Sequence, residues 1–136
     1  MISFNYETNF ELENEERLAT WLTSVIIEED FSEGEINYIF CDDDYLHKLN
    51  VEFLKHDTLT DIISFDYTLG KLINGDIYIS VERVLDNAKD FEVDFKSELH
   101  RVMVHGILHY CGYKDKNKDD KTMMRTKENY YISKIV

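Results

Sequence analysis

The chain has 136 residues, a length that corresponds to one domain and allows a hydrophobic core without disulfide bonds. Hydrophobic residues make up 43% and charged residues 32%, and proline is absent, which excludes global disorder, collagen-like repeats and low-complexity chains. No apolar run approaches the ~18–20 residues of a membrane helix, no signal peptide is recognisable, and two cysteines are too few for a disulfide framework. We therefore expect a cytoplasmic protein with free thiols.

The net charge of −13 is carried by the first half of the chain. Residues 1–61 contain 16 acidic and 3 basic side chains, whereas residues 62–136 contain 12 of each. This balance excludes a protein that coats nucleic acid with a generally basic surface, and a solvated acidic surface is the simplest explanation. Residues 114–127 nevertheless contain six basic and three acidic side chains, so a local RNA-binding groove is compatible with the sequence.

Hydrophobic periodicity and turn signals predict nine elements in chain order. Strands are expected over residues 2–7, 35–41, 61–67 and 76–81, with a turn at Asn74-Gly75 between the last two. Helices are expected over residues 14–29, 42–54 and 95–111, and from Ser80 and Lys118 onwards. The order β-α-β-α-β-β-α-α-α predicts a single α+β domain over residues 1–136, in which a small mixed sheet packs against helices.

The helix over residues 95–111 is the most apolar and carries a candidate metal site. His105 and His109 are four residues apart, so both imidazoles lie on one helix face. The helix ends at Gly112, after which the chain can return Asp115 as a third ligand. Three protein ligands with one open position are typical of catalytic zinc sites, where the ion lowers the pKa of a bound water to about 7. A histidine pair alone is a weak signal, but two unpartnered imidazoles in an apolar helix would be costly.

Other metal chemistry is less compatible with this segment. Peptidases with a His-Glu-x-x-His helix have their general base directly after the first histidine, where this chain has Gly106. Cys111 follows His109 by two residues and points to another helix face, so core packing explains it better than metal binding. The sequence shows no local signature of a nucleophilic triad and no glycine-rich phosphate loop.

The histidine segment resembles the motif of the YbeY family, bacterial rRNA maturation factors described as single-metal endoribonucleases. The family pattern is His-Gly-x-Leu-His-x-x-Gly-[Tyr/Phe]-Asp-His, and six of its positions match here: His105, Gly106, Leu108, His109, Gly112 and Tyr113. Lys114 replaces the family aspartate and Asp115 replaces the last histidine. A carboxylate can still bind a metal, although it adds charge and is a harder ligand than imidazole.

Two further segments extend the resemblance. The family stretch Leu-Asn-x-x-[Tyr/Phe]-Arg-x-Lys-Asp-x-Pro-Thr-Asp-Val-Leu-Ser-Phe corresponds to residues 49–65, and Gly-Asp-Ile-x-Ile-Ser corresponds to residues 75–80. The family arginine, to which activity is attributed, is Leu54 here, and the proline is Leu59. Leu54 cannot take the role of the family arginine, but the neighbouring Lys55 could substitute for that arginine. Asp57 and Asp61 match the family and either support the site or cap an element.

The resemblance implies an α+β fold with a zincin-like metal helix packed on a mixed sheet. It also implies a single-strand-specific endoribonuclease that acts in small-subunit rRNA maturation and ribosome quality control. His105, His109 and Asp115 would hold one divalent ion, with zinc expected first and another first-row metal as the alternative. The expected partners are ribosomal RNA, the small ribosomal subunit, one of its proteins and a GTPase of ribosome assembly, with no membrane involved.

The expected RNA-binding residues are Lys55, Lys114 and Lys116, with Lys118 and Arg125 further along, and a solvated surface is the alternative for all of them. No catalytic side chain is assigned, because a metal-activated water is expected to attack. Two other functions remain open. One is an assembly factor that mainly binds the ribosome through a structural or weakened metal site. The other is a metal hydrolase acting on a different ester or phosphodiester.

Overall fold

The predicted elements form in the predicted order, which confirms the α+β class. The computed structural model describes residues 1–56 and 58–135, and within these ranges it contains four strands and five helices. None of these helices is long and apolar enough to cross a membrane. The elements are β1 (Ile2–Tyr6), α1 (Glu15–Glu28), β2 (Ser32–Cys41), α2 (Asp43–Leu54), β3 (Ile62–Asp66), β4 (Leu72–Ser80), α3 (Val81–Asp90), α4 (Phe95–Tyr110) and α5 (Lys118–Ile132).

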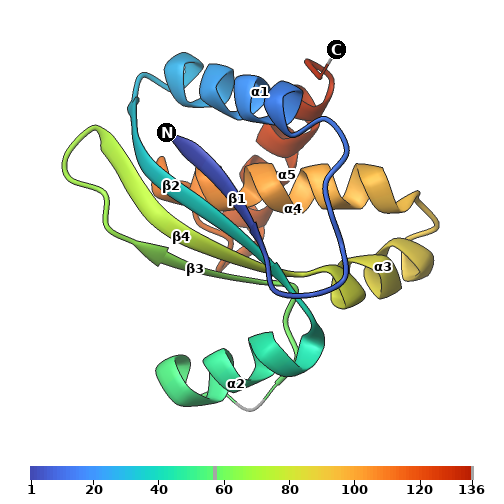
Figure 1. Cartoon of the computed structure of the whole chain (residues 1–136). Coiled ribbons are helices and arrows are strands. Elements are labelled where there is room, and N and C mark those ends of the chain that lie inside the picture. The colour runs from blue at the N-terminus through green and yellow to red at the C-terminus, as the bar shows by residue number, and fades with distance from the viewer. Residues whose placement is uncertain (57, 136) are drawn as a thin grey trace.

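The strands form one mixed sheet in the order β1-β2-β4-β3. β2 pairs in parallel with both β1 and β4, and β3 pairs antiparallel with β4, as expected for two strands joined by a hairpin. Successive residues of a strand point to opposite faces. In β4, Ile77 and Ile79 therefore face the main core, whereas Tyr78 packs in a smaller cluster with residues of α2. Figure 1 shows α1, α4 and α5 on one side of the sheet and α2 apart from them.

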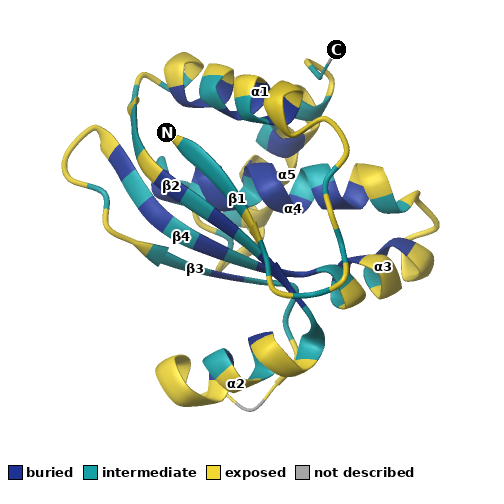
Figure 2. Ribbon diagram, in the orientation of Figure 1, coloured by how far each residue is buried: buried dark blue, intermediate teal, exposed yellow. Residues whose placement is uncertain are grey.

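The main core lies between the sheet and the inner faces of α1 and α4 (Figure 2). The apolar residues of α1 recur at helical spacing, so one face of this helix is buried, as the sequence predicts. The same holds for α4, the helix that carries the histidine pair. The fully buried members of the core include Leu22, Val25, Ile26, Ile36, Tyr38, Phe40, Ile77, Ile79, Met103, Val104, Ile107 and Leu108.

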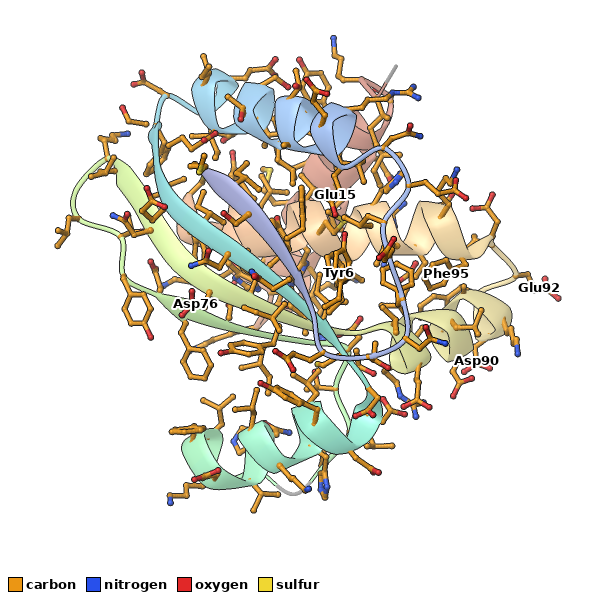
Figure 3. The ribbon with its side chains drawn as sticks, viewed as in Figure 1. Tyr6, Glu15, Asp76, Asp90, Glu92 and Phe95 are labelled. Carbon is orange, nitrogen blue, oxygen red and sulfur yellow. The ribbon has the colours of Figure 1, made fainter. Side chains whose placement is uncertain are left out.

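The connection between β1 and α1 packs against the start of α4. The Tyr6 hydroxyl donates a hydrogen bond to the Glu15 carboxylate, which joins the end of β1 to the first turn of α1 (Figure 3). Further along this connection, Phe10 meets Phe95 edge to face, with ring centroids 6.0 Å apart. The N-terminal segment therefore packs against the first turn of α4, the helix that carries the histidine pair.

The turn predicted at Asn74-Gly75 is wrong, because both residues lie inside β4. The chain reverses earlier, where Leu69 and Leu72 pair and Gly70 adopts a positive φ of 60°. The side chain of Asn74 makes a hydrogen bond across the sheet, in which its Oδ1 accepts from the backbone N–H of Glu35 at 2.8 Å. Gly75 is required for space rather than for a turn, since a Cβ there would lie 2.4 Å from the Tyr110 hydroxyl oxygen.

Candidate metal centre

Helix α4 places the two histidines on the same face. The helix begins after Asp94, whose Oδ1 accepts the backbone N–H of Ser97 at 2.7 Å and so caps its first turn. Most of the helix surface is buried against the sheet and its neighbours, whereas His105 and His109 are only half-buried. Their ring centroids lie 4.5 Å apart. The i, i+4 spacing therefore brings two imidazoles together on the partly exposed face of α4.

The chain turns back after α4 and brings Asp115 to the histidines. Gly112 makes this turn with a φ of 101°, a conformation that residues with a Cβ rarely adopt. Asp115 Oδ2 then lies 3.3 Å from Nε2 of His105 and 3.6 Å from Nε2 of His109. The three ligand atoms lie within 4.8 Å of one another. The structure thus brings together the three residues that the sequence pattern suggested.

The tautomers of both histidines suit a metal ligand. Nδ1 of His105 lies 2.7 Å from a carboxylate oxygen of Glu128, and Nδ1 of His109 lies 2.9 Å from the carbonyl oxygen of Tyr113. Both partners accept hydrogen bonds, so each Nδ1 carries the hydrogen and each neutral ring keeps its Nε2 lone pair free. Both lone pairs are on the side of Asp115. Histidines that bind metals are commonly held in this way at the other ring nitrogen.

Glu128 links His105 to the half-buried Arg101. Arg101 Nη1 donates to Glu128 Oε1 at 3.0 Å, while the other carboxylate oxygen holds His105. Burial alone would raise the pKa of Glu128, but the hydrogen bonds from His105 and Arg101 keep this pKa below its ordinary value. Burial would likewise lower the pKa of His105, and Glu128 outweighs this effect and raises it. Burial and the neighbouring His105 together lower the pKa of His109.

His105, His109 and Asp115, the three candidate ligands called the metal cluster below, form part of the wall of a cavity of about 530 Å³. Cationic side chains line this cavity, namely Arg101, Lys121 and Arg125, all from α4 and α5. Asp61 also lines it, close to the start of β3, and burial raises the pKa of this carboxyl while the charge of His105 opposes the rise. The cavity therefore combines a metal cluster, cations that could bind phosphates and buried acids.

The residues expected to bind RNA are placed differently by the structure. Lys114 and Lys116 flank Asp115, yet neither is among the described residues that line the cavity. Lys55 lies just after α2, where its Nζ donates to the Glu52 carbonyl oxygen at 3.4 Å, and it too is outside the cavity wall. Of the further basic residues that the sequence suggested, Arg125 lines the cavity and Lys118 does not.

Sequence reasoning missed Arg101, Lys121 and Glu128. Arg101 precedes His105 by four residues on the same helix, so helical spacing could have indicated it. Glu128 is 23 residues beyond His105, and no local pattern connects the two. Asp61 is not the N-cap of any of the five helices in the described chain. It directly precedes β3, so it either supports the site or caps this strand. Asp57 lies outside the described residues.

The structure also explains two features of the motif that are not ligands. A Cβ on Gly106 would lie 3.0 Å from Ile77 Cδ1 and 3.3 Å from Ile62 Cδ1, so this position faces the sheet and has no room for a catalytic glutamate. Cys111 packs against the main core, and burial raises the pKa of its thiol to about 12. A thiol of this kind is a core residue rather than a thiolate ligand.

Comparison with known proteins agrees with this geometry. The family described as Endoribonuclease YbeY matches residues 2–136 of the chain. The protein named Endoribonuclease YbeY from Flavobacterium johnsoniae is 66% identical over 133 residues, covering 98% of this chain and 96% of the relative. The protein of the same name from Cytophaga hutchinsonii is 47% identical over 131 residues, covering 96% of this chain and 92% of the relative.

A solved structure shows a similar fold. The solution structure of TM1509 from Thermotoga maritima superposes with a TM-score of 0.70 at 26% sequence identity, covering 99% of this chain and 89% of that one. The likeness therefore extends over the sheet, the metal helix and the helices around it. Together with the match over residues 2–136, it shows that the chain belongs to the endoribonuclease YbeY family.

Proposed function

We propose that this protein is a metal-dependent endoribonuclease that cleaves single-stranded RNA. One observation carries the proposal beyond family membership. Nε2 of His105, Nε2 of His109 and the carboxylate of Asp115 converge on the wall of a cavity that is also lined by cations. Side chains that could bind an ion and side chains that could bind phosphate thus face the same space. A phosphodiester substrate needs both, because its charge has to be neutralised while its bond is broken.

The donor set favours zinc as the ion. Two imidazole nitrogens and one carboxylate oxygen are ligands that zinc accepts, and other first-row divalent ions accept them as well. When bound, such an ion supplies a Lewis acid for a phosphoryl oxygen and lowers the pKa of water. Three protein ligands leave part of the coordination sphere open, as catalytic sites require.

The protein's own residues would orient the substrate and hold the ligands in place. Glu128 and the Tyr113 carbonyl fix the two imidazole rings through their Nδ1 atoms. Lys121 and Arg125 are exposed cations on the cavity wall and are placed to contact RNA phosphates. Arg101 is engaged with Glu128 and Asn129, so its main task is to orient Glu128.

We extend the proposal to the biological setting on the basis of family membership alone. The RNA would be the precursor of small-subunit ribosomal RNA, processed in the cytoplasm during maturation and quality control of the ribosome. A protein of the small subunit and a GTPase of ribosome assembly would be its partners. We expect the protein to cleave precursor rRNA within assembling subunits. A strain without the protein should be blocked at this step.

The test combines metal analysis with RNA cleavage. Purified protein should contain one zinc ion per chain and should cut a single-stranded RNA faster than the same sequence in a duplex. His105→Ala and His109→Ala should lose both the ion and the cleavage. His56→Ala is the matched control, because His56 is an exposed histidine outside the cavity. Full cleavage by a metal-free His105→Ala/His109→Ala protein would end the proposal.

A second function, binding without cleavage, is favoured by one observation. Leu54 stands where the family has its arginine, and it is exposed at the end of α2 away from the residues that line the cavity. The chain would then act as an assembly factor with a structural metal site. Rescue of a deletion strain distinguishes the two functions. A ligand variant that restores rRNA processing as well as the wild type favours binding, and one that fails to restore it favours the nuclease.

A further inference from the structure

A smaller cavity of about 320 Å³ adjoins the cavity of the metal cluster. The two share four wall residues: Phe91, Glu98, Arg101 and Arg125. Glu98 precedes His105 by seven residues on α4, which is two helical turns, or ~10 Å, along the same helix face. The two cavities therefore form one groove that runs from the metal cluster along α4 towards the turn between α3 and α4.

An exposed aromatic ring lies at the far end of this groove. Phe91 directly follows α3, is 59% exposed and lines both cavities. Its neighbours Asp90 and Glu92 lie at the outer edge of the molecule (Figure 3). Phe91 differs from the other exposed apolar side chains of the described residues because it lines both cavities beside the candidate metal ligands. Aromatic rings in such positions bind nucleotides by stacking on their bases.

The charged residues of the groove indicate where a base and where a phosphate of a nucleotide could bind. Glu98 lines both cavities although it is only 6% exposed, so an acidic residue of α4 forms part of the groove wall. Burial raises the pKa of this carboxyl, and the charge of Arg101 opposes the rise. A carboxyl group repels phosphate but accepts hydrogen bonds from the amino groups of bases. Arg125 and Lys121, on the α5 side of the groove, would attract the phosphates.

We propose that Phe91, Glu98 and Arg125 form a nucleotide subsite next to the metal centre, which takes one unpaired nucleotide of the RNA. Phe91 stacks on the base, Glu98 accepts a hydrogen bond from its amino group, and Arg125 contacts a phosphate. This inference rests on the proposed nuclease function and deepens it. A base in a duplex is already stacked and paired, so it cannot enter this subsite. The subsite thus gives the physical reason for cleavage of single strands.

The first test measures RNA affinity in Phe91→Ala. The full chain is treated with a chelator to stop hydrolysis, and binding of a short fluorescent single-stranded RNA is followed by anisotropy. Loss of one stacking contact should weaken binding roughly 5- to 100-fold. Phe53→Ala is the matched control, because Phe53 is 58% exposed but lies on α2, outside the groove. Equal affinities of the two variants would overturn the subsite.

The second test detects stacking directly. The chain contains one tryptophan, Trp21, which is only 5% exposed and donates its indole N–H to the Tyr131 carbonyl oxygen. Phe91→Trp adds a second indole at an exposed position. Single-stranded RNA should quench the emission of this variant and leave the emission of the wild type unchanged. An emission that RNA does not alter, in a variant that still binds RNA, would exclude stacking at this position.

The third test concerns base preference. If Glu98 accepts a base amino group, short cytidine or adenosine oligonucleotides should bind more tightly than uridine ones, which lack an exocyclic amine. Glu98→Gln should reduce this difference, because its amide can both donate and accept. An unchanged preference in Glu98→Gln would remove Glu98 from the subsite.

Failure of the subsite and failure of the nuclease function can be told apart. If His105→Ala abolishes cleavage while Phe91→Ala binds and cuts RNA like the wild type, the nuclease function stands and the subsite is wrong. If His105→Ala still cuts RNA, the nuclease proposal itself fails. If Phe91→Ala binds RNA normally but loses binding to a ribosomal protein, the exposed ring is a protein contact and the subsite is likewise wrong.

Discussion

The orientation of each histidine depends on an acceptor from outside α4. His105 is held by the carboxylate of Glu128 on α5, and His109 by the carbonyl oxygen of Tyr113 in the following loop. Only Glu128 can be removed by mutation without changing the backbone. Because Arg101 would then lose its carboxylate partner as well, the arrangement around His105 depends on this one side chain.

We predict that Glu128→Gln weakens metal binding about 10- to 100-fold, the range observed when the outer partner of a metal-binding histidine is replaced. The amide is nearly the same size as the carboxyl but lacks the charge that stabilises the hydrogen on Nδ1. Competition with a chromophoric zinc chelator at neutral pH measures the change. Glu52→Gln, an exposed glutamate on α2, serves as the control and should bind metal like the wild type. A change of less than twofold in Glu128→Gln would contradict the prediction.

At the level of elements, one carboxylate joins the end of α1 to α5 and to the loop of the metal site. Glu29 accepts hydrogen bonds from the Tyr113 hydroxyl at 2.7 Å, from Lys127 Nζ at 3.2 Å and from the Tyr131 hydroxyl. Burial alone would raise the pKa of Glu29, but these three donors keep this pKa below its ordinary value of 4.5. The ionised form of Glu29 therefore stabilises the folded protein.

We predict that Glu29→Gln lowers the free energy of unfolding by about 1–3 kcal/mol at neutral pH, since the partly buried hydroxyls of Tyr113 and Tyr131 lose a charged acceptor. A carboxyl with a lowered folded pKa stabilises the protein above its unfolded pKa, and this contribution is lost as pH falls through the folded value. The difference between wild type and variant should thus shrink below the ordinary value of 4.5. Urea unfolding across this pH range measures it, with Glu28→Gln as the neighbouring control. A difference that stays constant as pH falls would show that the charge of Glu29 is not responsible.

Strand β4 and helix α4 touch so closely that one position between them excludes a side chain. A Cβ on Gly75 would lie 2.4 Å from the hydroxyl oxygen and 2.5 Å from Cζ of Tyr110. That hydroxyl also donates to the Phe65 carbonyl oxygen at 3.0 Å, so the ring cannot move away without breaking this bond. The contact fixes the C-terminal end of the metal helix on the sheet.

We predict that Gly75→Ala destabilises the protein by about 1–3 kcal/mol, the usual cost of overpacking a core. Unfolding in urea measures the change. Leu72→Ala, at an exposed position of the same strand, is the control and should change stability by less. If Gly75→Ala were as stable as the wild type, the close approach of Tyr110 to the strand would be wrong.

At the level of the whole molecule, metal binding and folding should be coupled. The three ligands come from α4 and from the loop before α5, and the partners of the histidines come from α5 and that same loop. The unfolded chain cannot hold His105 and Asp115 at 3.3 Å, so an ion held by these ligands would bind the folded state preferentially.

We predict that zinc at 100 times its dissociation constant raises the free energy of unfolding by about 2.7 kcal/mol. For a chain of this size, the midpoint of thermal unfolding should rise by about 10 °C. Scanning fluorimetry with zinc and with chelator measures the shift. The variant His105→Ala/His109→Ala should show no such shift, and an equal shift in this variant would place the bound zinc elsewhere.

The sequence by itself determined the order of the elements, the α+β class and the three candidate metal ligands that the structure brings together. These features depend on local periodicity: helical spacing places His105 and His109 on one face whatever the rest of the chain does. Gly112 and Asp115 follow the histidines closely in the sequence, so the third candidate ligand could be predicted from the same segment. The argument against a peptidase depends on Gly106 for the same local reason.

Only the tertiary structure decided which residues surround the cluster and where the groove runs. Glu128 and Arg125 reach the cavity because α5 packs beside α4, while Lys114 and Lys116 stay outside its wall although they flank a ligand. The strand order β1-β2-β4-β3 could likewise not be predicted from the sequence, nor could the close approach of Tyr110 to Gly75. Local patterns specify which face a residue occupies, but the neighbours of that face depend on how distant segments pack together.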